Sequence, residues 1–418
     1  MSNKNSYKMY PSDWVNYTFD ELFAFEGGLS ISRANLSNEG ICYLHYGDIH
    51  KTNDNYINIE KNFDSIPKYN KPLESINKKY LLNDGDIVFA DASEDYEGIG
   101  KAVVVKNPSN IPFISGLHTI VARDKTDVLN NEYKRFFLSD WNIRKQIMLM
   151  ATGISVYGLS QENVRKIKVT LPKRQEQQKI ASILSTWDKA IELKEKLIEQ
   201  KKQQKKGLMQ KLLTGEVRLP GFEGKWRSLR ILNFCNTYSG GTPSRTRKEF
   251  YENGTIPWIK SGELNSRKVT QTEEYITEKA LANSTAKLVN PETILLALYG
   301  ATAGVVAMSK IRASINQAIL AIVPNDNCDN NFLFYYLENH MDKVTKKYTQ
   351  GGQPNLNADI VKKMVVKLPS IEEQKAIANI LSNIDNNIEL LEKELNWLKQ
   401  QKKGLMQLLL TGKVRVKV

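Results

Sequence analysis

The sequence predicts a mixed α/β protein in which two globular domains alternate with two long, coiled-coil-like helices. The first observation is an internal duplication: the stretch Leu171–Leu219 recurs 197 residues later as Leu368–Val416, with about thirty of 49 positions identical. The run Lys202–Gln210 recurs unchanged as Lys399–Gln407. The second observation is a heptad pattern inside each copy, and the third is a series of strand-like runs between the copies. We therefore read the chain as two half-units.

Each copy of the repeat has the pattern of one long helix. In the second copy, apolar residues recur at alternating steps of four and three, interrupted only by Lys402. The first copy keeps this apolar seam, although Lys194, Lys201 and Lys205 break it. A seven-residue repeat is typical of a helix that lies along a partner helix. If the second helix packs on the first, chain order requires the pair to be antiparallel; the alternative is that both are ordinary core helices.

Glycine and proline mark the ends of these helices. Pro172 and Pro369 stand where a helix would begin, and a glycine follows each predicted end, at 215 and 412. A helix of about 40 residues would be about 60 Å long. Gly207 and Gly404 lie inside the pattern, where we expect a weak point or a close backbone approach. The expected domains are two globular domains at 1–170 and 220–367, a first long helix at 171–219, and a second long helix with a tail at 368–418.

Composition indicates a globular protein with a polyanionic partner. Apolar residues make up 41% of the chain and charged residues 25%, and the formal net charge is +13. A strongly basic balance suggests nucleic acid first. The first repeat has 12 Lys and Arg against 6 Asp and Glu, whereas the second is nearly neutral at 7 against 6. A run such as Lys201–Lys206 is usually a solvated helix face.

Cysteine and hydropathy patterns predict a cytoplasmic protein. The three cysteines lie far apart without CxxC spacing, and the four histidines form no cluster, which argues against disulfides and against a metal site. The N-terminus is polar and has no signal-peptide pattern. The longest uncharged run, Thr293–Ser309, is short for a membrane span and reads as a buried strand pair.

The two blocks between the repeats share landmarks. Each opens with a tryptophan and a double glycine, continues with a strand that ends in glycine and an acidic residue, and later contains a helical segment, at 131–148 and at 330–347. Each block ends in a glycine-bearing loop, at 151–160 and at 349–357. Short apolar runs between turn residues read as strands. The halves thus share a scaffold and differ in their loops, which suggests constant partners and variable ligands.

Motifs for catalysis are incomplete. The nearest match to an amino-methyltransferase motif, Asn107–Asn110, lacks the second proline and the aromatic residue. The phosphate-loop-like run Gly98–Ala102 lacks its first glycine and its Ser or Thr. A cluster of carboxylates has no properly spaced Lys or His for a nuclease, so turn chemistry explains it better: Asp84, Asp86, Asp91, Glu94, Asp95 and Glu97. The sequence therefore argues against an autonomous enzyme.

The chain resembles the specificity subunits of type I restriction–modification systems. The resemblance rests on the two LP…EQ…IA.IL…D..I segments at 171–191 and 368–388, the twin KKGLMQ and LLTG endings, and SGGTPSR at 239–245 with IPWIKSGEL at 256–264. It covers the chain from Trp14 onward. The first domain keeps the double glycine but not the following TPS.

The resemblance implies two α/β target-recognition domains spaced by antiparallel helices, on a subunit without catalytic activity. It also implies double-stranded DNA and two methyltransferase subunits as partners, with two restriction subunits in the full complex. The cofactors S-adenosylmethionine, ATP and Mg²⁺ would lie on those partners, and none on this chain. Each domain would read one half of a bipartite, asymmetric site, with half-sites about 10–11 base pairs apart to face one side of the duplex.

Polar and aromatic residues in predicted loops are the DNA-binding candidates, although each one can equally be an ordinary surface residue. In the first domain they are Arg33, Lys51, Asn53, Tyr96, His118 and Tyr157. In the second they are Thr242, Ser244, Arg245, Arg247, Lys260, Tyr299, Asn316, Gln317, Gln350 and Gln353. His118 and Gln317 occupy corresponding positions, so a structural hydrogen-bonding role is the alternative for both.

Candidates for partner contact lie on the predicted helices. They are Trp187, Trp397, Leu208, Met209, Leu405 and Met406. Trp187 sits on the seam, which favours core packing, whereas Trp397 lies one position off it.

Two other functions remain open at this level. A self-sufficient DNA-modifying enzyme with unrecognised motifs would transfer methyl groups as a single chain. A scaffold that binds no nucleic acid is disfavoured by the basic charge and the divergent polar loops. A specificity subunit of a related system that only methylates, or that acts in defence through another effector, has the same sequence features.

Overall fold

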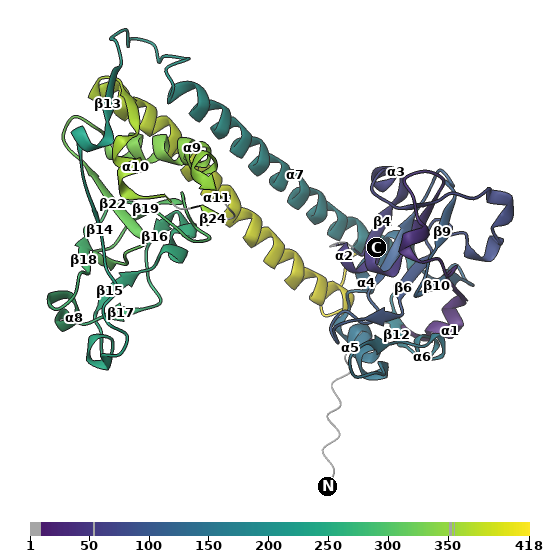
Figure 1. Ribbon diagram of the computed structural model, residues 1–418. Coiled ribbons are helices and arrows are strands. Elements are labelled where there is room, and N and C mark those ends of the chain that lie inside the picture. Colours follow the sequence, from purple (N-terminus) through teal and green to yellow (C-terminus); the bar gives the residue numbers. More distant parts are fainter. Residues whose placement is uncertain (1–9, 53–54, 351–352, 355) are drawn as a thin grey trace. The chain divides into compact units, whose positions relative to one another are not determined.

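The computed structural model describes residues 10–52, 55–350, 353–354 and 356–418, and it leaves out the side chains of residues 349, 350, 353 and 354. The chain forms two compact units, Met1–Lys194 with Glu394–Val418, and Glu195–Lys393. Each unit contains one sheet domain and one half of each long helix. The predicted mixed α/β fold class is confirmed (Figure 1).

The first unit is built on a five-stranded sheet with a three-stranded sheet beside it. The larger sheet has the order β2 (Phe23–Gly27), β10 (Thr119–Asp124), β6 (Ile87–Ala90), β8 (Ala102–Lys106) and β4 (Tyr56–Asn58). The smaller sheet has the order β5 (Lys68–Tyr69), β3 (Ile41–Leu44) and β9 (Phe113–Ser115). The short helices of this domain are α1 (Phe19–Leu22), α2 (Tyr46–Lys51), α3 (Ile59–Asn62) and α6 (Gln161–Arg165).

The second unit repeats this strand order. Its larger sheet contains β14 (Cys235–Ser239), β22 (Ile319–Pro324), β19 (Ile294–Ala297), β20 (Val306–Ser309) and β16 (Lys268–Val269). The smaller sheet contains β17 (Tyr275–Ile276), β15 (Ile256–Ile259), β21 (Ala313–Ile315) and β18 (Lys287–Val289). Two short helices follow in sequence, α8 (Glu278–Ala282) and α10 (Ala358–Lys363). The duplication therefore includes the sheet domains, where little sequence similarity is left.

Burial explains why the central strands are continuous apolar runs. In β19, Ile294 and Leu296 face one hydrophobic core, and Leu295 and Ala297 face another. Successive side chains of a strand point to opposite faces, so a strand covered on both faces has no polar positions. The prediction of a buried strand pair at 293–309 is confirmed by β19 and β20.

The predicted helical segments of the two domains differ in continuity. The segment at 330–347 is one helix, α9 (Asn330–Tyr348). The segment at 131–148 is instead two helices, α4 (Asn131–Phe137) and α5 (Trp141–Met150). The chain breaks at Asp140, whose side chain accepts a hydrogen bond from the Asn142 N–H and so begins a new helix.

The two long helices are α7 (Arg174–Leu212) and α11 (Ile371–Leu410), as the repeat predicts. Each follows a strand that pairs with the strand opening its sheet domain: β12 (Lys168–Leu171) with β1 (Val15–Thr18), and β25 (Val365–Leu368) with β13 (Arg227–Arg230). The Thr-Gly pairs that follow the helices contain Gly215 and Gly412, which have φ of +74° and +68°. This left-handed conformation favours glycine after a helix end.

The close backbone approach, one of the two alternatives expected at the interior glycines, is not found. Both Gly207 and Gly404 lie within continuous helix, and a Cβ atom at either position would meet nothing within 4 Å. Neither glycine therefore marks a close backbone approach.

Within each unit, the halves of α7 and α11 pack antiparallel, as their seams predict. In the first unit, Leu184 of α7 shares a core with Leu409 near the end of α11. In the second, Leu212 near the end of α7 shares a core with Leu381 of α11. Figure 1 shows the early part of one helix beside the late part of the other in each unit.

The repeated Glu-Gln pair fixes each helix start to its sheet domain. The Gln177 side chain is fully buried and makes three hydrogen bonds of 2.9 to 3.0 Å, two to the backbone of residues 128–130 and one to the proline carbonyl at the helix start. Gln374 makes the equivalent bonds with the backbone of residues 327–329 and its own proline carbonyl. Buried amides need such partners.

The preceding glutamate binds the arginine that ends the other helix repeat. Arg415 donates to Glu176 at 2.7 Å, and Arg218 donates to Glu373 at 2.6 Å. Each guanidinium also lies over the tryptophan that opens the sheet domain, Trp14 at 5.9 Å and Trp226 at 5.7 Å. These contacts account for the Glu, Gln and Arg positions of the repeat.

Candidate nucleic-acid interface

In the first sheet domain, three chain segments emerge at one edge. Strands β3 and β9 are parallel, with Leu44 opposite Ser115, so the segments after them emerge side by side. The last residue of β6, Ala90, pairs with Thr119, which follows the turn after β9. This edge therefore carries helix α2, the turn 116–118 and the segment that begins at Asp91. Polar residues that follow strand ends can face a ligand because the rigid sheet fixes the position of their backbone.

His118 and Asp91 form the centre of this edge. The His118 Nδ1 atom lies 3.0 Å from Asp91 Oδ1, and the Tyr46 ring meets the imidazole edge-on with 5.4 Å between centroids. Burial raises the pKa of Asp91, against the opposing effect of the imidazole. His118 has a φ of +54° and its side chain is 50% exposed. A non-glycine residue in this strained conformation, with half its ring open, fits a recognition role as well as a turn.

Two tyrosines extend the same edge. The rings of Tyr96 and Tyr157 lie 5.3 Å apart, and the Tyr96 hydroxyl donates to the Met148 carbonyl at 2.9 Å. Tyr157 belongs to β11 (Tyr157–Gly158), which pairs with β7 (Ala92–Ser93) directly after Asp91. The structure therefore brings three predicted residues, Tyr96, Tyr157 and His118, to one edge.

The remaining candidates of the first domain lie around α2. Arg33 donates to Asp48 of α2 at 2.9 Å, and its side chain is 50% exposed. Lys51 is the exposed last residue of α2. Asn53 lies outside the described residues.

The second domain presents an equivalent edge. Strands β15 and β21 are parallel, with Ile259 opposite Ile315, and Lys260 and Asn316 directly follow them. The Asn316 N–H donates to the Ile259 carbonyl at 3.0 Å, and the Asn316 side chain accepts from the Ala318 N–H at 3.2 Å. Asn316 thus also serves the turn. The same turn holds Gln317, which accepts a hydrogen bond from Thr242, so these two predicted residues do meet.

One carboxylate binds two of the predicted cations at this edge. Glu274 binds Arg245 at 2.7 Å and Lys260 at 2.9 Å. These two partners, Arg245 first, lower the pKa of Glu274. Arg245 also lies over the rings of Tyr251 and Trp258, at 4.5 and 5.1 Å. An arginine held over aromatic rings is oriented before any ligand arrives.

The other predicted residues of the second domain are more scattered. Arg247 pairs with Glu249 at 2.9 Å, and Ser244 bonds the Thr246 hydroxyl at 2.9 Å. Tyr299, 38% exposed, follows β19. Gln350 and Gln353 pair across a hairpin of β23 (Thr349–Gln350) and β24 (Gln353–Pro354), and their side chains lie outside the described part of the chain.

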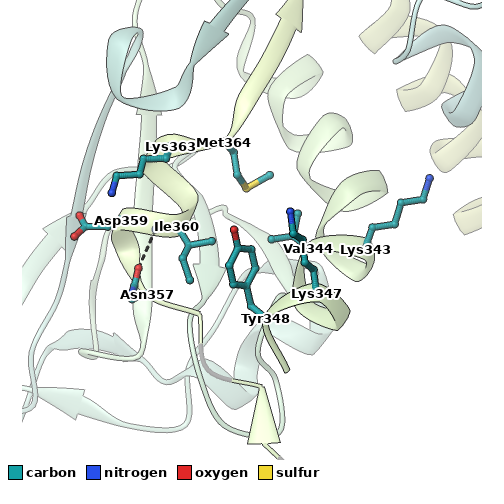
Figure 2. A pocket seen from close by; sticks show the side chains of 9 residues that line it. All are labelled: Lys343, Val344, Lys347, Tyr348, Asn357, Asp359, Ile360, Lys363 and Met364. Atoms are coloured by element: carbon teal, nitrogen blue, oxygen red, sulfur yellow. Dashed lines mark hydrogen bonds between the residues drawn. The ribbon is translucent and has the colours of Figure 1, made fainter. Parts of the chain in front are cut away.

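A lysine-lined pocket beside this edge was not predicted. It has a volume of about 580 Å³ between the end of α9 and α10, and its cations are Lys343, Lys347 and Lys363. Figure 2 shows the Tyr348 hydroxyl pointing toward Ile360 and Met364 at the centre of this pocket. Among the described residues, none of the three lysines forms an ion pair. The sequence signal was the run DKVTKKY, which repeats lysine at helical spacing.

The pocket adjoins the reading edge through the backbone. The Leu356 N–H donates to the Leu298 carbonyl at 2.8 Å, one residue before Tyr299. Free ammonium groups next to a polar edge are suited to phosphate oxygens.

The acidic cluster has structural partners. Asp84 accepts from the Asn107 N–H at 2.7 Å, Asp86 binds Arg123 at 3.0 Å, and Asp95 accepts from the Gly98 N–H. Over the described ranges, no group of three or more His, Cys, Asp or Glu side chains is placed to hold a metal ion. Over the same ranges, no helix is long and apolar enough to cross a bilayer.

The six residues of this chain that are predicted to contact partner subunits differ in their exposure to solvent. Trp397 is 57% exposed on α11, whereas Trp187 of α7 is half-buried. Met209 is buried in the core of the second unit, and three others pack partly against their cores: Leu208, Leu405 and Met406. Trp397 therefore offers the largest free apolar surface of the six.

Comparison with known proteins agrees with this architecture. The family model for the type I restriction modification DNA specificity domain matches twice, at residues 11–203 and 223–400. The putative type I restriction enzyme MjaX specificity subunit of Methanocaldococcus jannaschii is 30% identical over 360 residues, which cover 81% of this chain and 80% of that protein. The MjaVIII specificity subunit of the same organism is 28% identical over 375 residues, covering 83% of each chain.

Solved structures support the fold. The S subunit of a type I restriction–modification system from M. genitalium aligns with a TM-score of 0.56 at 16% identity, over 98% of each chain. The HsdS subunit from Thermoanaerobacter tengcongensis aligns with a TM-score of 0.52 at 17% identity, over 99% of this chain and 100% of that one. With two matched domains that cover most of its length, the chain belongs to the family of type I restriction–modification DNA specificity subunits, which recognise DNA and are not catalytic.

Proposed function

We propose that each sheet domain of this chain reads one half of a bipartite, asymmetric DNA site and that the paired helices set the gap between the halves. The observation that carries this proposal is the duplicated edge. In each domain, beside a five-stranded sheet of equivalent strand order, a smaller sheet presents polar and aromatic side chains after a pair of parallel strands, and these side chains differ between the domains. Two different readers on one scaffold are suited to two different half-sites.

Base edges in the major groove supply the specificity. Each base pair has a distinct pattern of donors and acceptors there, and arginine, amide and hydroxyl groups match those patterns. On binding, Arg245 and Lys260 exchange Glu274 for base or phosphate oxygens. In the first domain, His118 and the two tyrosines in edge-on contact meet the bases. The two halves thus use different chemistry.

Phosphate contacts supply affinity. Lys343, Lys347 and Lys363 line a pocket beside the second reading edge, with Asp359 as its one carboxylate among the lining residues, and we expect a backbone phosphate to bind to these lysines. Such contacts carry no sequence information but set the register of the protein on the duplex.

The cofactors of the reaction belong to partner subunits. Two methyltransferase subunits, with S-adenosylmethionine, dock on the repeated helix surfaces and modify adenine, with Trp397 and Trp187 among the contacts. Two restriction subunits, with ATP and Mg²⁺, join for cleavage. The complex works in the cytoplasm, where its DNA is.

Reconstitution tests this proposal. The chain is co-expressed with the modification subunit of its own genome and a plasmid library that contains random sequence. Methylation of one bipartite motif, absent when the chain is omitted, is the expected result. Methylation without the chain, or methyl transfer by the chain alone, would contradict the assignment.

A further inference from the structure

Two of the lysines that interrupt the apolar seams, Lys205 and Lys402, have aspartate partners on the opposite helix. Lys205 of α7 lies 2.8 Å from Asp385 of α11, and Lys402 of α11 contacts Asp188 of α7. The pairs occupy equivalent repeat positions, since 205 and 402, like 188 and 385, differ by 197. On each helix the aspartate and the lysine are 17 residues apart, about 25 Å by helical rise.

In the first unit, the sheet domain supplies a third member. Arg135 of α4 donates from Nη2 to Asp188 Oδ2 at 2.7 Å, while Lys402 takes the other carboxylate oxygen. The Arg135 guanidinium is held over the rings of Tyr56 and Phe136, at 4.2 and 4.7 Å. Its side chain is only 15% exposed. One carboxylate therefore joins both helices and the sheet domain.

The second unit has the same arrangement with a different arginine. Arg267, between the 3₁₀ helix 261–266 and β16, donates from Nη2 to Asp385 Oδ2 at 2.8 Å, and Lys205 binds Oδ1. Tyr335 of α9 also donates to Asp385, at 2.7 Å. Arg267 adopts a φ of +62°, a conformation that side chains rarely take, and its guanidinium also binds Glu338 at 2.9 Å. Backbone strain at this arginine is tolerated because the contacts fix it.

These joints are more than surface ion pairs. The side chains of Asp385 and Lys205 are each 13% exposed, so the charges are largely removed from water. Burial alone would raise the pKa of Asp385, but Arg267 and Lys205 outweigh it and hold the pKa below its usual value. A desolvated pair adds little stability over apolar packing, yet removing one partner leaves an uncompensated charge. Its best-attested use is to fix register between helices.

Resting on the proposed function, we infer that Asp188 and Asp385 are positioning residues that fix the angle of each reading edge on the helix pair and so restrict the DNA gap to one length. One added base pair moves a half-site by about 3.4 Å along the duplex and by about 34° around it. DNA binding is restricted to one gap length only if each sheet domain is held rigidly on the helix pair. Each aspartate does this by binding both helices and its own sheet domain.

The test is gap strictness. The chain carrying Asp188→Asn, or Asp385→Asn, is assembled with its methyltransferase subunits and offered plasmids whose half-sites are separated by the native gap or by one base pair more or fewer. Asparagine keeps the volume but cannot accept from both cations. We expect methylation at the altered gaps, relative to the native gap, to rise about tenfold, because the side chain no longer joins the cation of the opposite helix to the cation of the sheet domain. Unchanged strictness in both variants would overturn the inference.

Two further variants separate positioning from general damage. Glu394→Gln removes an exposed contact of 2.8 Å with Lys194 on the same two helices but touches no sheet domain, so its gap should stay strict. If the aspartate variants do not fold, Arg135→Gln removes only the sheet-domain arm of the first joint and should relax the gap by itself. A wild-type complex that methylates no bipartite motif would refute the proposed function, whereas strict aspartate variants of an active complex would refute only this inference.

Discussion

At the scale of single residues, the repeat is explained by side chains that bind the backbone. Gln177 and Gln374 are completely buried, and their side-chain amides hydrogen-bond to backbone groups of a loop and of the proline before each helix. Substitution at these positions lowers the stability of the fold, because a buried polar group without a hydrogen-bond partner costs about 1–3 kcal/mol. The conserved-looking EQ of the repeat is thus a joint between helix and sheet domain.

Gln177→Leu tests this explanation. It leaves three backbone groups without their partner, so the free energy of unfolding should fall by about 2–3 kcal/mol. The measurement is the melting temperature of the full chain by calorimetry. Gln203→Ala is the matched control on the same helix, since Gln203 makes an exposed 2.8 Å contact with Glu199, and it should change little. Equal effects would contradict the account.

The Asp385 joint predicts a pH dependence with a definite sign. Because the folded pKa lies below the unfolded value of about 3.9, the ionised carboxylate stabilises the fold above that pH, and this contribution is lost as pH falls through the folded pKa. At pH 7, Asp385→Asn should therefore be less stable than wild type by about 2 kcal/mol. Urea unfolding as a function of pH should show the difference shrinking below about pH 4; a constant difference would argue against an ionised Asp385.

At the scale of elements, the second domain has a cationic pocket between two helices. The end of α9 and the short α10 together present Lys343, Lys347 and Lys363 (Figure 2). In the first domain, the equivalent α6 pairs its cations instead, Arg165 with Asp20 and Lys166 with Glu162. Phosphate affinity should therefore be concentrated in the second domain.

Salt dependence checks this assignment. For each of the three lysines changed to glutamine, the slope of log K against log salt should become shallower by about 0.9. Binding of the assembled complex to DNA, with and without the motif, is measured by fluorescence anisotropy at several salt concentrations. Lys310→Gln is the control, because Glu292 already holds that ammonium at 2.7 Å. An unchanged slope of log K against log salt in the variant with all three lysines replaced would show that the pocket does not contact DNA.

Some structural elements follow from local sequence patterns, and others depend on contacts that such patterns do not reveal. The duplication predicts α7, α11 and their antiparallel packing, because apolar periodicity is local. The split between α4 and α5 was missed because one capping residue, Asp140, overrides helical spacing. Lys205 and Lys402 were visible as interruptions of the seam, but their partners were not, since Asp385 and Asp188 lie far away in sequence. The lysine pocket escaped prediction because two separate helices form it.

For the candidate site residues, the sequence predicts the loops on which they lie better than the contacts that they make. Strand ends that emerge together bring His118, Tyr96 and Tyr157 to one edge, as their loop positions suggest. That Glu274 holds both Arg245 and Lys260 depends on a strand pairing that no local pattern reveals. The contact of each residue with a base stays a prediction.

At the scale of the whole molecule, the two helices should act as a ruler. Four residues inserted within 192–205 and four at the matching place in 389–402 lengthen both helices by about 6 Å, near two base pairs at about 3.4 Å each. The methylated motif should gain two base pairs in its gap, read by sequencing of plasmid DNA. Insertion in α7 alone misaligns Lys205 with Asp385 and should reduce methylation. Retention of the original gap by the paired insertion would disprove the ruler.

The central claim is that this chain alone selects the DNA sequence for partner enzymes. Long-read methylation sequencing of the native genome, with the gene present and deleted, tests it most directly. Deletion should abolish N6-methyladenine at one bipartite, asymmetric motif and leave other methylation intact. Exchange of residues 220–367 for the corresponding domain of a relative should change only one half of the motif. Methylation that persists at that motif after deletion would contradict the claim.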